Sequence, residues 1–371
     1  MVTQNNMGKI ASLSLLLFVL ILFYPVSSHA QFKGVGDIFT AGEAGLNDTE
    51  ILLKEYLRPF GSGFGASMNA AWTDRASTHS LLGFHVKVSV SAAMVPSSNR
   101  SFDINELNLT TLQLEDPTAS SIAPTFSGSS DPGPRLTYQV EDVELANFRM
   151  PEGIGLRVVP APMIQAGVGL IRDTDVMIRF IPPVSNSDFG EISLYGLGVK
   201  HEINQWIPGG RFFPLTFSVT AGYTSFKSSA SLSAEPSNYA NATDPNNYGD
   251  ASSPTWENQE IALSTNAFSM NLLVGRSFPI LSVYAGVGFE RSSTSIEVSG
   301  NYPYYIHLPD HPVHDRQLMA LSDPLDISID GANKVRALAG LRISLPLLTF
   351  NIDYTVSEYS IVSAGLGISF R

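Results

Sequence analysis

Hydrophobic and polar residues alternate strictly in several stretches of the chain. In GFHVKVSVSAAMV, residues 83–95, apolar side chains occupy the even positions from Phe84 onward and polar side chains the odd positions up to Ser91. The pattern returns in residues 215–226, 267–276, 347–356 and 360–371. Alternation with a period of two is typical of a β-strand that has one apolar and one polar face. The sequence therefore predicts an all-β protein from residue 81 to residue 371.

Four stretches of the chain carry related glycine phrases: QAGVGLIR (165–172), YGLGVKHE (195–202), YAGVGFER (284–291) and SAGLGISFR (363–371). A dinucleotide site would need such a phrase in a turn between a strand and a helix, and none of the four has that context. Glycine inside a strand instead allows another group to approach closely. Because the glycines share a face with the polar residues, we expect that face to line a barrel lumen. The lumen candidates are Gly167, Gly169, Gly286, Gly288, His85 and Lys87.

The connections between the predicted strands differ in length. Residues 208–214, 276–280 and 344–347 read as tight turns, whereas residues 227–258 and 300–333 are long and polar. Tight turns at one end and long loops at the other are typical of a transmembrane barrel. We therefore predict an antiparallel transmembrane β-barrel of roughly 12–14 strands. A soluble periplasmic β-sandwich that binds a ligand is the alternative fold, because its strands also alternate.

The first 30 residues read as a secretory signal peptide. Lys9 precedes an apolar run, Ile10 to Phe23, and Ser28-His29-Ala30 fits a signal-peptidase site, so cleavage is expected before Gln31. An uncleaved membrane anchor is the alternative, although the run is short for a transmembrane helix. Together with the barrel pattern, the signal predicts that the protein lies in the cell outer membrane and contacts its lipid.

Residues 31–80 lack the alternating pattern. Helical spacing of apolar residues predicts one short helix from about Asp48 to Arg58, ended by Pro59 and Gly61. The following FGSGFGASMNAAW, residues 60–72, has neither a helical nor a strand period. The segment is too small to hold a core of its own. We expect it to act as a plug inside the barrel.

Composition excludes some classes of function. The chain has no cysteine, so disulfides and thiol chemistry are excluded. It has 34 acidic and 22 basic residues, a net charge of −12, which makes nucleic acid an unfavourable partner. Charged residues make up only 15% of the chain, against about 25% in ordinary soluble proteins. Such a deficit is expected of a protein with a lipid-facing belt.

One loop concentrates histidines and carboxylates. The stretch HLPDHPVHDR contains ligand types that suit zinc or another divalent metal. Its prolines, however, prevent a helix that would align the ligands, and a solvated loop is the simpler interpretation. We assign no metal site and keep as weak candidates His307, Asp310, His311 and His314, with Asp315 beside them.

No catalytic motif stands out, so no enzymatic activity and no cofactor are predicted. The serine elbow G-x-S-x-G is absent. His85 and His201 are expected on the polar face, where a hydrogen-bonded structural role is the simpler interpretation. Cations near the strand ends read as rim charges, or as groups that bind lipid head groups or line a pore beside Glu290 and Asp353; these cations are Arg172, Lys200, Arg291, Arg342 and Arg371. An interfacial aromatic girdle is expected from Tyr195, Trp206, Tyr223, Tyr284, Phe289 and Tyr354.

The chain shows three resemblances to known families. The C-terminal SIVSAGLGISFR resembles the last strand of bacterial outer-membrane barrels, which implies recognition by the barrel-assembly machinery; here Phe370 is penultimate instead of terminal. The phrases GVGDIFTAGEA, YLRPFGSGFGASMNAAW, LLGF and VKHEINQWIPG are similar to an uncharacterised family of secreted Gram-negative proteins. More loosely, the layout resembles the plugged barrels that transport long-chain fatty acids.

These observations favour a channel or transporter for a small molecule, hydrophobic molecules included, with residues 31–80 as its plug. The alternative is a structural or interaction protein of the outer membrane that contacts partners through its long loops.

Overall fold

The computed structural model describes residues 45–140, 143–186, 190–232, 256, 258–307, 316–331 and 334–370. The predicted signal peptide, the weak metal candidates Asp310, His311 and His314, and Arg371 lie outside the described residues. One long helix, α3 (Leu46–Asn69), precedes the first strand.

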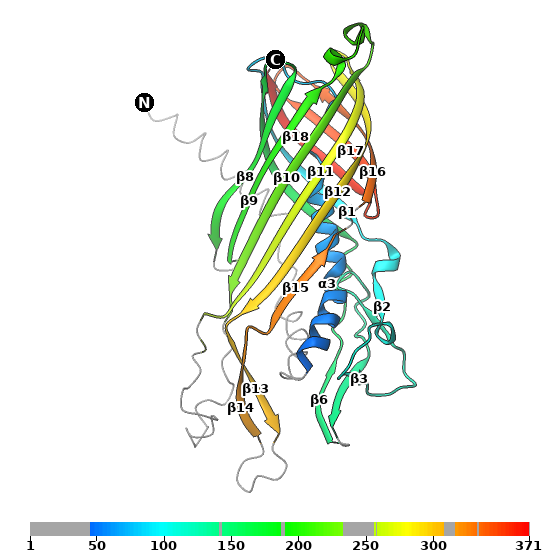
Figure 1. Cartoon of the computed structure of the whole chain (residues 1–371), viewed down its shortest axis with the longest axis vertical. Coiled ribbons are helices and arrows are strands. Elements are labelled where there is room, and N and C mark those ends of the chain that lie inside the picture. Colours follow the sequence, from blue (N-terminus) through cyan, green and yellow to red (C-terminus); the bar gives the residue numbers. More distant parts are fainter. Residues whose placement is uncertain are drawn as a thin grey trace.

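Ten long strands form one closed antiparallel ring in the described chain (Figure 1). Each strand pairs with the next around the ring, and β1 pairs with both β7 and β18. The ring strands, in ring order, are β1 (Phe84–Met94), β7 (Val158–Leu170), β8 (Thr174–Asn186), β9 (Gly190–Glu202), β10 (Thr216–Ser231), β11 (Glu260–Ser277), β12 (Leu281–Ser299), β16 (Lys334–Ser344), β17 (Thr349–Val356) and β18 (Ile361–Phe370).

The structure confirms the predicted antiparallel barrel and corrects its size. The ring holds ten strands in the described chain instead of roughly 12–14, because the segments after β1 and after β12 form small sheets outside it. These short strands are β2 (Ser101–Asp103), β3 (Gln113–Leu114), β4 (Ile122–Pro124), β5 (Arg135–Val140), β6 (Val143–Arg149), β13 (Asn301–His307), β14 (Arg316–Ser322) and β15 (Leu325–Asp330). A closed ring also excludes the sandwich.

The barrel is apolar outside and polar inside. In β1, Phe84 and Val86 face outward and are 44% and 40% exposed, whereas His85 and Lys87 are buried. The same alternation runs through β18, where Val362 to Phe370 give an outward apolar face nine residues long. About 9–11 residues of a tilted strand cross a bilayer. The barrel is therefore of the transmembrane type, and no described helix is long and apolar enough to cross a membrane by itself.

An aromatic row marks where the apolar belt ends on the longer strands. On β8 and β9, Phe180 and Tyr195 touch, and on β10 and β11, Tyr223 pairs with Phe268. Beyond this row the outward positions of β10 become polar, as at Lys227. Exposed Tyr354 and Trp206 fit the girdle predicted from the sequence, but Tyr284 does not. Its side chain points inward and is only 4% exposed.

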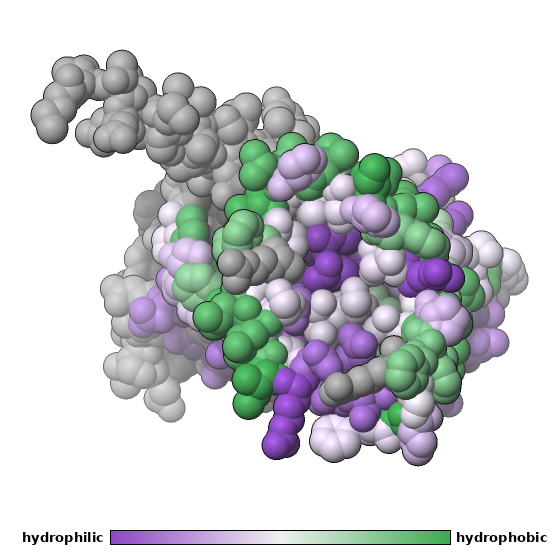
Figure 2. All heavy atoms as spheres, turned by 90° about the horizontal axis from the view of Figure 1, so that it is seen from above, coloured by the Kyte–Doolittle hydropathy of each residue, from purple (hydrophilic) through white to green (hydrophobic). Residues whose placement is uncertain are grey.

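The two ends of the barrel differ. The tight turns after β7, β11 and β16 lie at the upper end in Figure 1, where β18 also ends; we call this the short-turn end. The helical turns η5 (Asn204–Trp206) and η6 (Gly210–Phe212) join β9 to β10 there. From above, hydrophilic residues gather in the middle and hydrophobic ones around the rim (Figure 2). The opposite, long-loop end carries the long connections from β1 to β7, β10 to β11 and β12 to β16.

A second core lies at the long-loop end. Here the first half of α3 packs against β2–β6, with η3 (Ser97–Asn99) and η4 (Ile104–Glu106), and against β15 and the end of β12; we call this assembly the head. Leu52, Leu53 and Tyr56 of the helix are at most 4% exposed in its core. Asp48 accepts hydrogen bonds from the backbone N–H groups of residues 110–112. The head thereby fixes the start of the helix.

Helix α3 is longer than the sequence predicted. It continues through Pro59 and through the glycine-rich stretch to Asn69. A side chain at Gly63 would lie 2.8 Å from Val159 of β7, and one at Gly61 would lie 3.2 Å from Ile329 of β15. Small residues therefore serve close packing against the sheet here and do not end the helix. With 24 residues, α3 is about 36 Å long and reaches from the head into the barrel.

Candidate functional site

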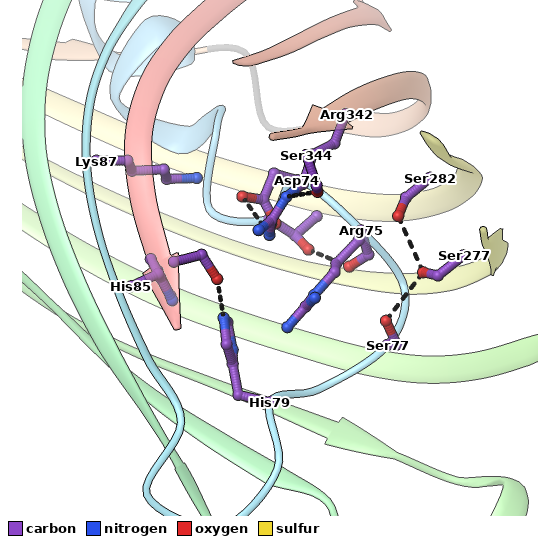
Figure 3. A network of polar contacts seen from close by, with 12 residues as sticks. Asp74, Arg75, Ser77, His79, His85, Lys87, Ser277, Ser282, Arg342 and Ser344 are labelled. Carbon is purple, nitrogen blue, oxygen red and sulfur yellow. Dashed lines mark hydrogen bonds and ion pairs between the residues drawn. The ribbon is translucent and has the colours of Figure 1, made fainter. Parts of the chain in front are cut away.

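Residues 70–79, which we call the inner segment, run lengthwise through the barrel. Where α3 ends, the Ser67 hydroxyl donates to the carbonyl of Val159, near the long-loop end of β7. Further along, Asp74 contacts Arg342 close to the end of β16. His79 reaches Ser369, next to the last described residue of β18. The chain then leaves the barrel at the short-turn end and enters β1 (Figure 3).

Side chains of the wall bind the carbonyl groups along this path. Lys87 donates to the carbonyl of Ala71 at 2.7 Å, and Lys200 donates to that of Ser77 at 2.7 Å. Other wall side chains do the same: Arg336 and Ser269 donate to the carbonyl of Asn69. Gln165 donates to the carbonyl of Trp72, and Tyr284 donates to that of Thr73. Irregular backbone at membrane depth needs such partners, because each unpaired buried group costs free energy.

Arg179 of β8 closes the end of the helix. Its guanidinium donates at 2.6 Å to the carbonyls of both Met68 and Ala70, and its Cζ lies 3.7 Å from the ring centroid of Trp72. The last carbonyls of a helix have no partner within the helix and carry partial negative charge. The guanidinium of Arg179 supplies hydrogen-bond donors for these carbonyls and a positive charge beside them, and its planar group stacks on the indole ring.

Ion pairs join the inner segment to the wall. Arg342 donates to both carboxylate oxygens of Asp74 at 3.1 Å (Figure 3). Asp175 of β8 accepts from the backbone N–H of His79 at 2.9 Å and lies 3.2 Å from Lys200. These side chains are almost inaccessible to solvent, and breaking a buried pair by removing one partner costs about 3–5 kcal/mol.

Glycines of the wall make room for the inner segment. The indole ring of Trp72 lies directly over Gly198 of β9 and Gly222 of β10, where any added Cβ would overlap it. At Gly167 a Cβ would meet the ring of His85, and at Gly169 it would meet His79 and the Ser80 carbonyl. Gly286 lies beside Leu273 and Gly288 lies beside Asn271, both on the neighbouring strand β11. Leu273 and Asn271 are buried, so these glycines also face the interior.

The structure separates the other residues noted in the sequence. His85 and Lys87 lie in the interior, 7% and 3% exposed. His201, expected inside, is on the outer face, because the alternation places Lys200 inside; its ring accepts a hydrogen bond from Trp206 at 2.8 Å. Of the predicted rim cations, Lys200 and Arg342 are buried in the interior, where Glu290 and Asp353 also lie. Arg172 and Arg291 are exposed.

Several buried polar atoms on one wall have no hydrogen-bond partner in the described structure. They are His85 Nδ1 and Ser89 Oγ on β1 and Asn351 Nδ2 and Asp353 Oδ2 on β17. β18 lies between these strands and presents Gly365 opposite both Ser89 and Asn351. Buried polar groups are normally paired, so these atoms are ready to bind water or a polar solute. No cluster of three metal-binding side chains occurs among the described residues, and of the four weak metal candidates only His307, the end of β13, is described.

One chain of contacts has the residue types of a hydrolase triad. The Ser369 hydroxyl lies 3.3 Å from His79 Nε2, and His79 Nδ1 lies 3.0 Å from Asp175 Oδ2. A serine, a histidine and a carboxylate in this order can deliver a nucleophile and a general base. This chain of contacts could not be predicted from the sequence, because the three residues come from the inner segment, β8 and β18 and match no local motif.

Several solved structures are similar to this chain. The translocator domain of the autotransporter NalP from Neisseria meningitidis is 10% identical, with a TM-score of 0.27, over 79% of this chain and 90% of that chain. The protease OmpT from Escherichia coli is 9% identical, with a TM-score of 0.25, over 80% and 100%. The attachment invasion protein Ail of Yersinia pestis is 8% identical, with a TM-score of 0.24, over 78% and 99%.

No curated protein matches the chain. A family model matches residues 7–370 and so covers nearly the whole sequence. By this match the protein belongs to DUF6588, a family of unknown function.

Proposed function

We propose that the protein is an outer-membrane channel for small polar solutes, closed in this structure by the inner segment. The observation that carries the proposal is that side chains of the wall, and not backbone pairing, hold the inner segment in the barrel. The hydrogen bonds and ion pairs that hold residues 70–79 run through side chains, as those of Lys87, Lys200 and Arg342 do. Such contacts can be broken and remade while the backbone ladder of the ring stays intact.

The apolar outer surface of the ring supports the placement of the protein in a membrane. An apolar outer surface and a polar interior suit a barrel surrounded by lipid, and closure pairs every ring strand on both sides. The predicted signal peptide and the predicted assembly signal of the last strand agree with export to the outer membrane.

The charges of the wall favour anionic over hydrophobic solutes. Lys87, Arg179, Lys200, Arg336 and Arg342 are the buried basic residues of the ring, and Asp175, Glu290 and Asp353 are the buried acidic ones. The five basic residues exceed the three acidic ones by two positive charges. Half-buried Glu202 at the short-turn end reduces this excess to one positive charge. When the inner segment moves aside, these cations lose its carbonyls as partners. An anion is the solute that replaces them best.

A reversible disulfide tests the gate. The hydroxyls of Ser77 in the inner segment and Ser277 in β11 are 3.1 Å apart, and the natural chain has no cysteine. Ser77→Cys with Ser277→Cys is close enough to be bridged and fastens the segment to the wall. In planar bilayers we expect channel openings in the reduced form, a reversal potential on the anion side, and no openings after oxidation.

The matched control joins two wall strands only. Ser277 and Ser282 lie 3.0 Å apart in the β11–β12 turn, so Ser277→Cys with Ser282→Cys forms a similar bridge and leaves the inner segment free. Its conductance should not depend on redox state. Equal conductance of the oxidised and reduced Ser77–Ser277 variant would disprove the gate, and cation selectivity would disprove the proposed solute class alone.

The triad favours a second candidate function, hydrolysis of an ester at the short-turn end. Ser369 would attack the carbonyl carbon while His79 takes the hydroxyl proton, and the protonated histidine would then give that proton to the departing alcohol. Water would release the acyl group by the same route. A fluorophosphonate probe should label the natural protein and not Ser369→Ala, with Ser363→Ala as control. Absence of labelling in folded natural protein would end this candidate.

A further inference from the structure

Helix α3 runs from the long-loop end into the barrel. Its N-terminal end lies in the head at the long-loop end, where Asp48 contacts residues 110–112. Its C-terminal end lies inside the barrel, where Arg179 binds Met68 and Ala70. The chain therefore enters the ring from the long-loop end and leaves it at the short-turn end before β1 begins (Figure 1).

The contacts of successive residues establish this direction independently of the overall view. β1 runs from Phe84 at the short-turn end to Met94 at the other, and Ser67 contacts Ala93 near the end of this strand. Ala71 then contacts Lys87, the fourth residue of the strand, and His79 stacks on His85, the second. From Ser67 to His79, the end of α3 and the inner segment together thus run antiparallel to β1.

The outer surface shows which end projects from the membrane. Strands β10, β11 and β12 are 16 to 19 residues long, well beyond the nine or so that span the belt. Their outward positions near the long-loop end are polar and line a groove of about 390 Å³ that includes Lys227, Glu260 and Glu297. At the short-turn end the turns are tight and carry exposed apolar residues such as Phe212, Phe278 and Leu347. In outer-membrane barrels the long, polar end faces outward from the cell.

We propose that the chain crosses the outer membrane through its own barrel, so that the head and the start of α3 stand on the cell surface. The part of the chain before Leu46 joins the helix on that side. The barrel then acts as an anchor that presents its N-terminal region outside the cell, in addition to any passage of solutes. The head core gives this presented region a fixed form, because the helix binds the head and the wall at its two ends.

Single cysteines in this cysteine-free chain test the threading directly. Glu50→Cys marks the start of α3, Glu106→Cys marks the β2–β4 part of the head, and Arg172→Cys marks the short-turn end; all three positions are exposed. The probe is a membrane-impermeant maleimide, applied to intact cells and to cells with a permeabilised outer membrane. We expect full labelling of Glu50→Cys and Glu106→Cys on intact cells, and labelling of Arg172→Cys only after permeabilisation.

Each other result has a defined meaning. Labelling of Glu106→Cys but not Glu50→Cys on intact cells would show that the helix starts on the inner side, and the threading would be wrong. Labelling of Arg172→Cys alone on intact cells would invert the barrel and overturn the proposal as well. A heat-dependent shift in SDS electrophoresis establishes that each variant is folded. Because no conductance is measured, failure here is distinct from failure of the proposed channel.

Discussion

Trp72 of the inner segment packs closely against Gly198 and Gly222 of the wall. Gly222→Val places two methyl groups where the indole ring lies, so the ring must move. Overpacking of this kind costs about 1–3 kcal/mol. We expect the variant to loosen the inner segment, which a single cysteine at Ser77 reports through faster reaction with a thiol reagent. Ala221→Val adds the same side chain to the lipid-facing side of β10 and should leave the rate unchanged.

Asp48 makes the attachment of α3 to the head sensitive to acid. Burial alone raises the pKa of this carboxyl, but hydrogen bonds from the backbone of Leu112, Thr110 and Thr111 outweigh it and leave the pKa below its ordinary value. A lowered pKa in the folded state means that the contact stabilises the head above about pH 4 and is lost as the pH falls through the lowered value. Limited proteolysis of the head between pH 7 and pH 2 measures this.

Asp48→Asn removes the charge and with it the acid-dependent step. Hydrogen bonds to a charged group contribute about 1.5–3 kcal/mol, so the variant should be cleaved faster than the natural protein at neutral pH. Glu50→Gln, an exposed change in the same turn of the helix, is the control. Identical acid dependence of Asp48→Asn and the natural protein would contradict the assignment.

The C-terminal end of α3 is held by Arg179 more than by any property of the helix itself. Arg179→Leu keeps an apolar stem against Trp72 but leaves the Met68 and Ala70 carbonyls without their strongest donor. Each unpaired buried carbonyl costs about 1–3 kcal/mol. We expect the temperature of the heat-dependent mobility shift to fall and channel openings to become more frequent. Arg172→Leu, at an exposed turn of the neighbouring loop, should change neither.

At the level of elements, the sequence predicted the strands better than the helix. Alternation in residues 83–95 and 360–371 reflects a surface between lipid and a polar interior, so β1 and β18 were predictable. The helix was predicted to end near Pro59 because glycine and proline disfavour helices in isolation. Packing of Gly61 and Gly63 against the sheet overrides that propensity. The small strands β2–β6 depend on packing within the head, and their short sequences show no sustained alternation of apolar and polar residues.

The interior site was only partly predictable for the same reason. His85 and Lys87 follow from alternation on a clearly patterned strand. Arg179 and Asp175 belong to β8, whose pattern is interrupted by a bulge near Ile181, and Trp72 belongs to a segment without a period. Their roles depend on which residues the closed ring brings together. A search for basic residues at inward positions of every candidate strand would have found Arg179.

For the whole molecule, the ring and its contents should be separable. The ring is closed by backbone pairing of all ten strands, and this pairing does not pass through α3 or the inner segment. Deletion of residues 45–79 removes Asp74 and the carbonyls that Arg179, Lys87 and Arg336 bind, and exposes these cations to the lumen. We therefore expect a folded barrel that is less stable to heat, conducts ions continuously and prefers anions.

The measurement is the conductance and reversal potential of the deletion variant in a planar bilayer, with its heat-dependent shift as proof of folding. The deletion removes the partners of at least three buried cations, which water entering the lumen restores. It also removes Leu52, Leu53 and Tyr56 from the core of the head, which adds to the loss of heat stability. A barrel that folds but does not conduct would mean that the wall closes by itself, and the inner segment would then be a support instead of a gate. If the deletion variant does not fold, Gly222→Val tests the same point, because it displaces the inner segment without removing it. Conductance that rises in Gly222→Val and not in Ala221→Val assigns the closure to residues 70–79.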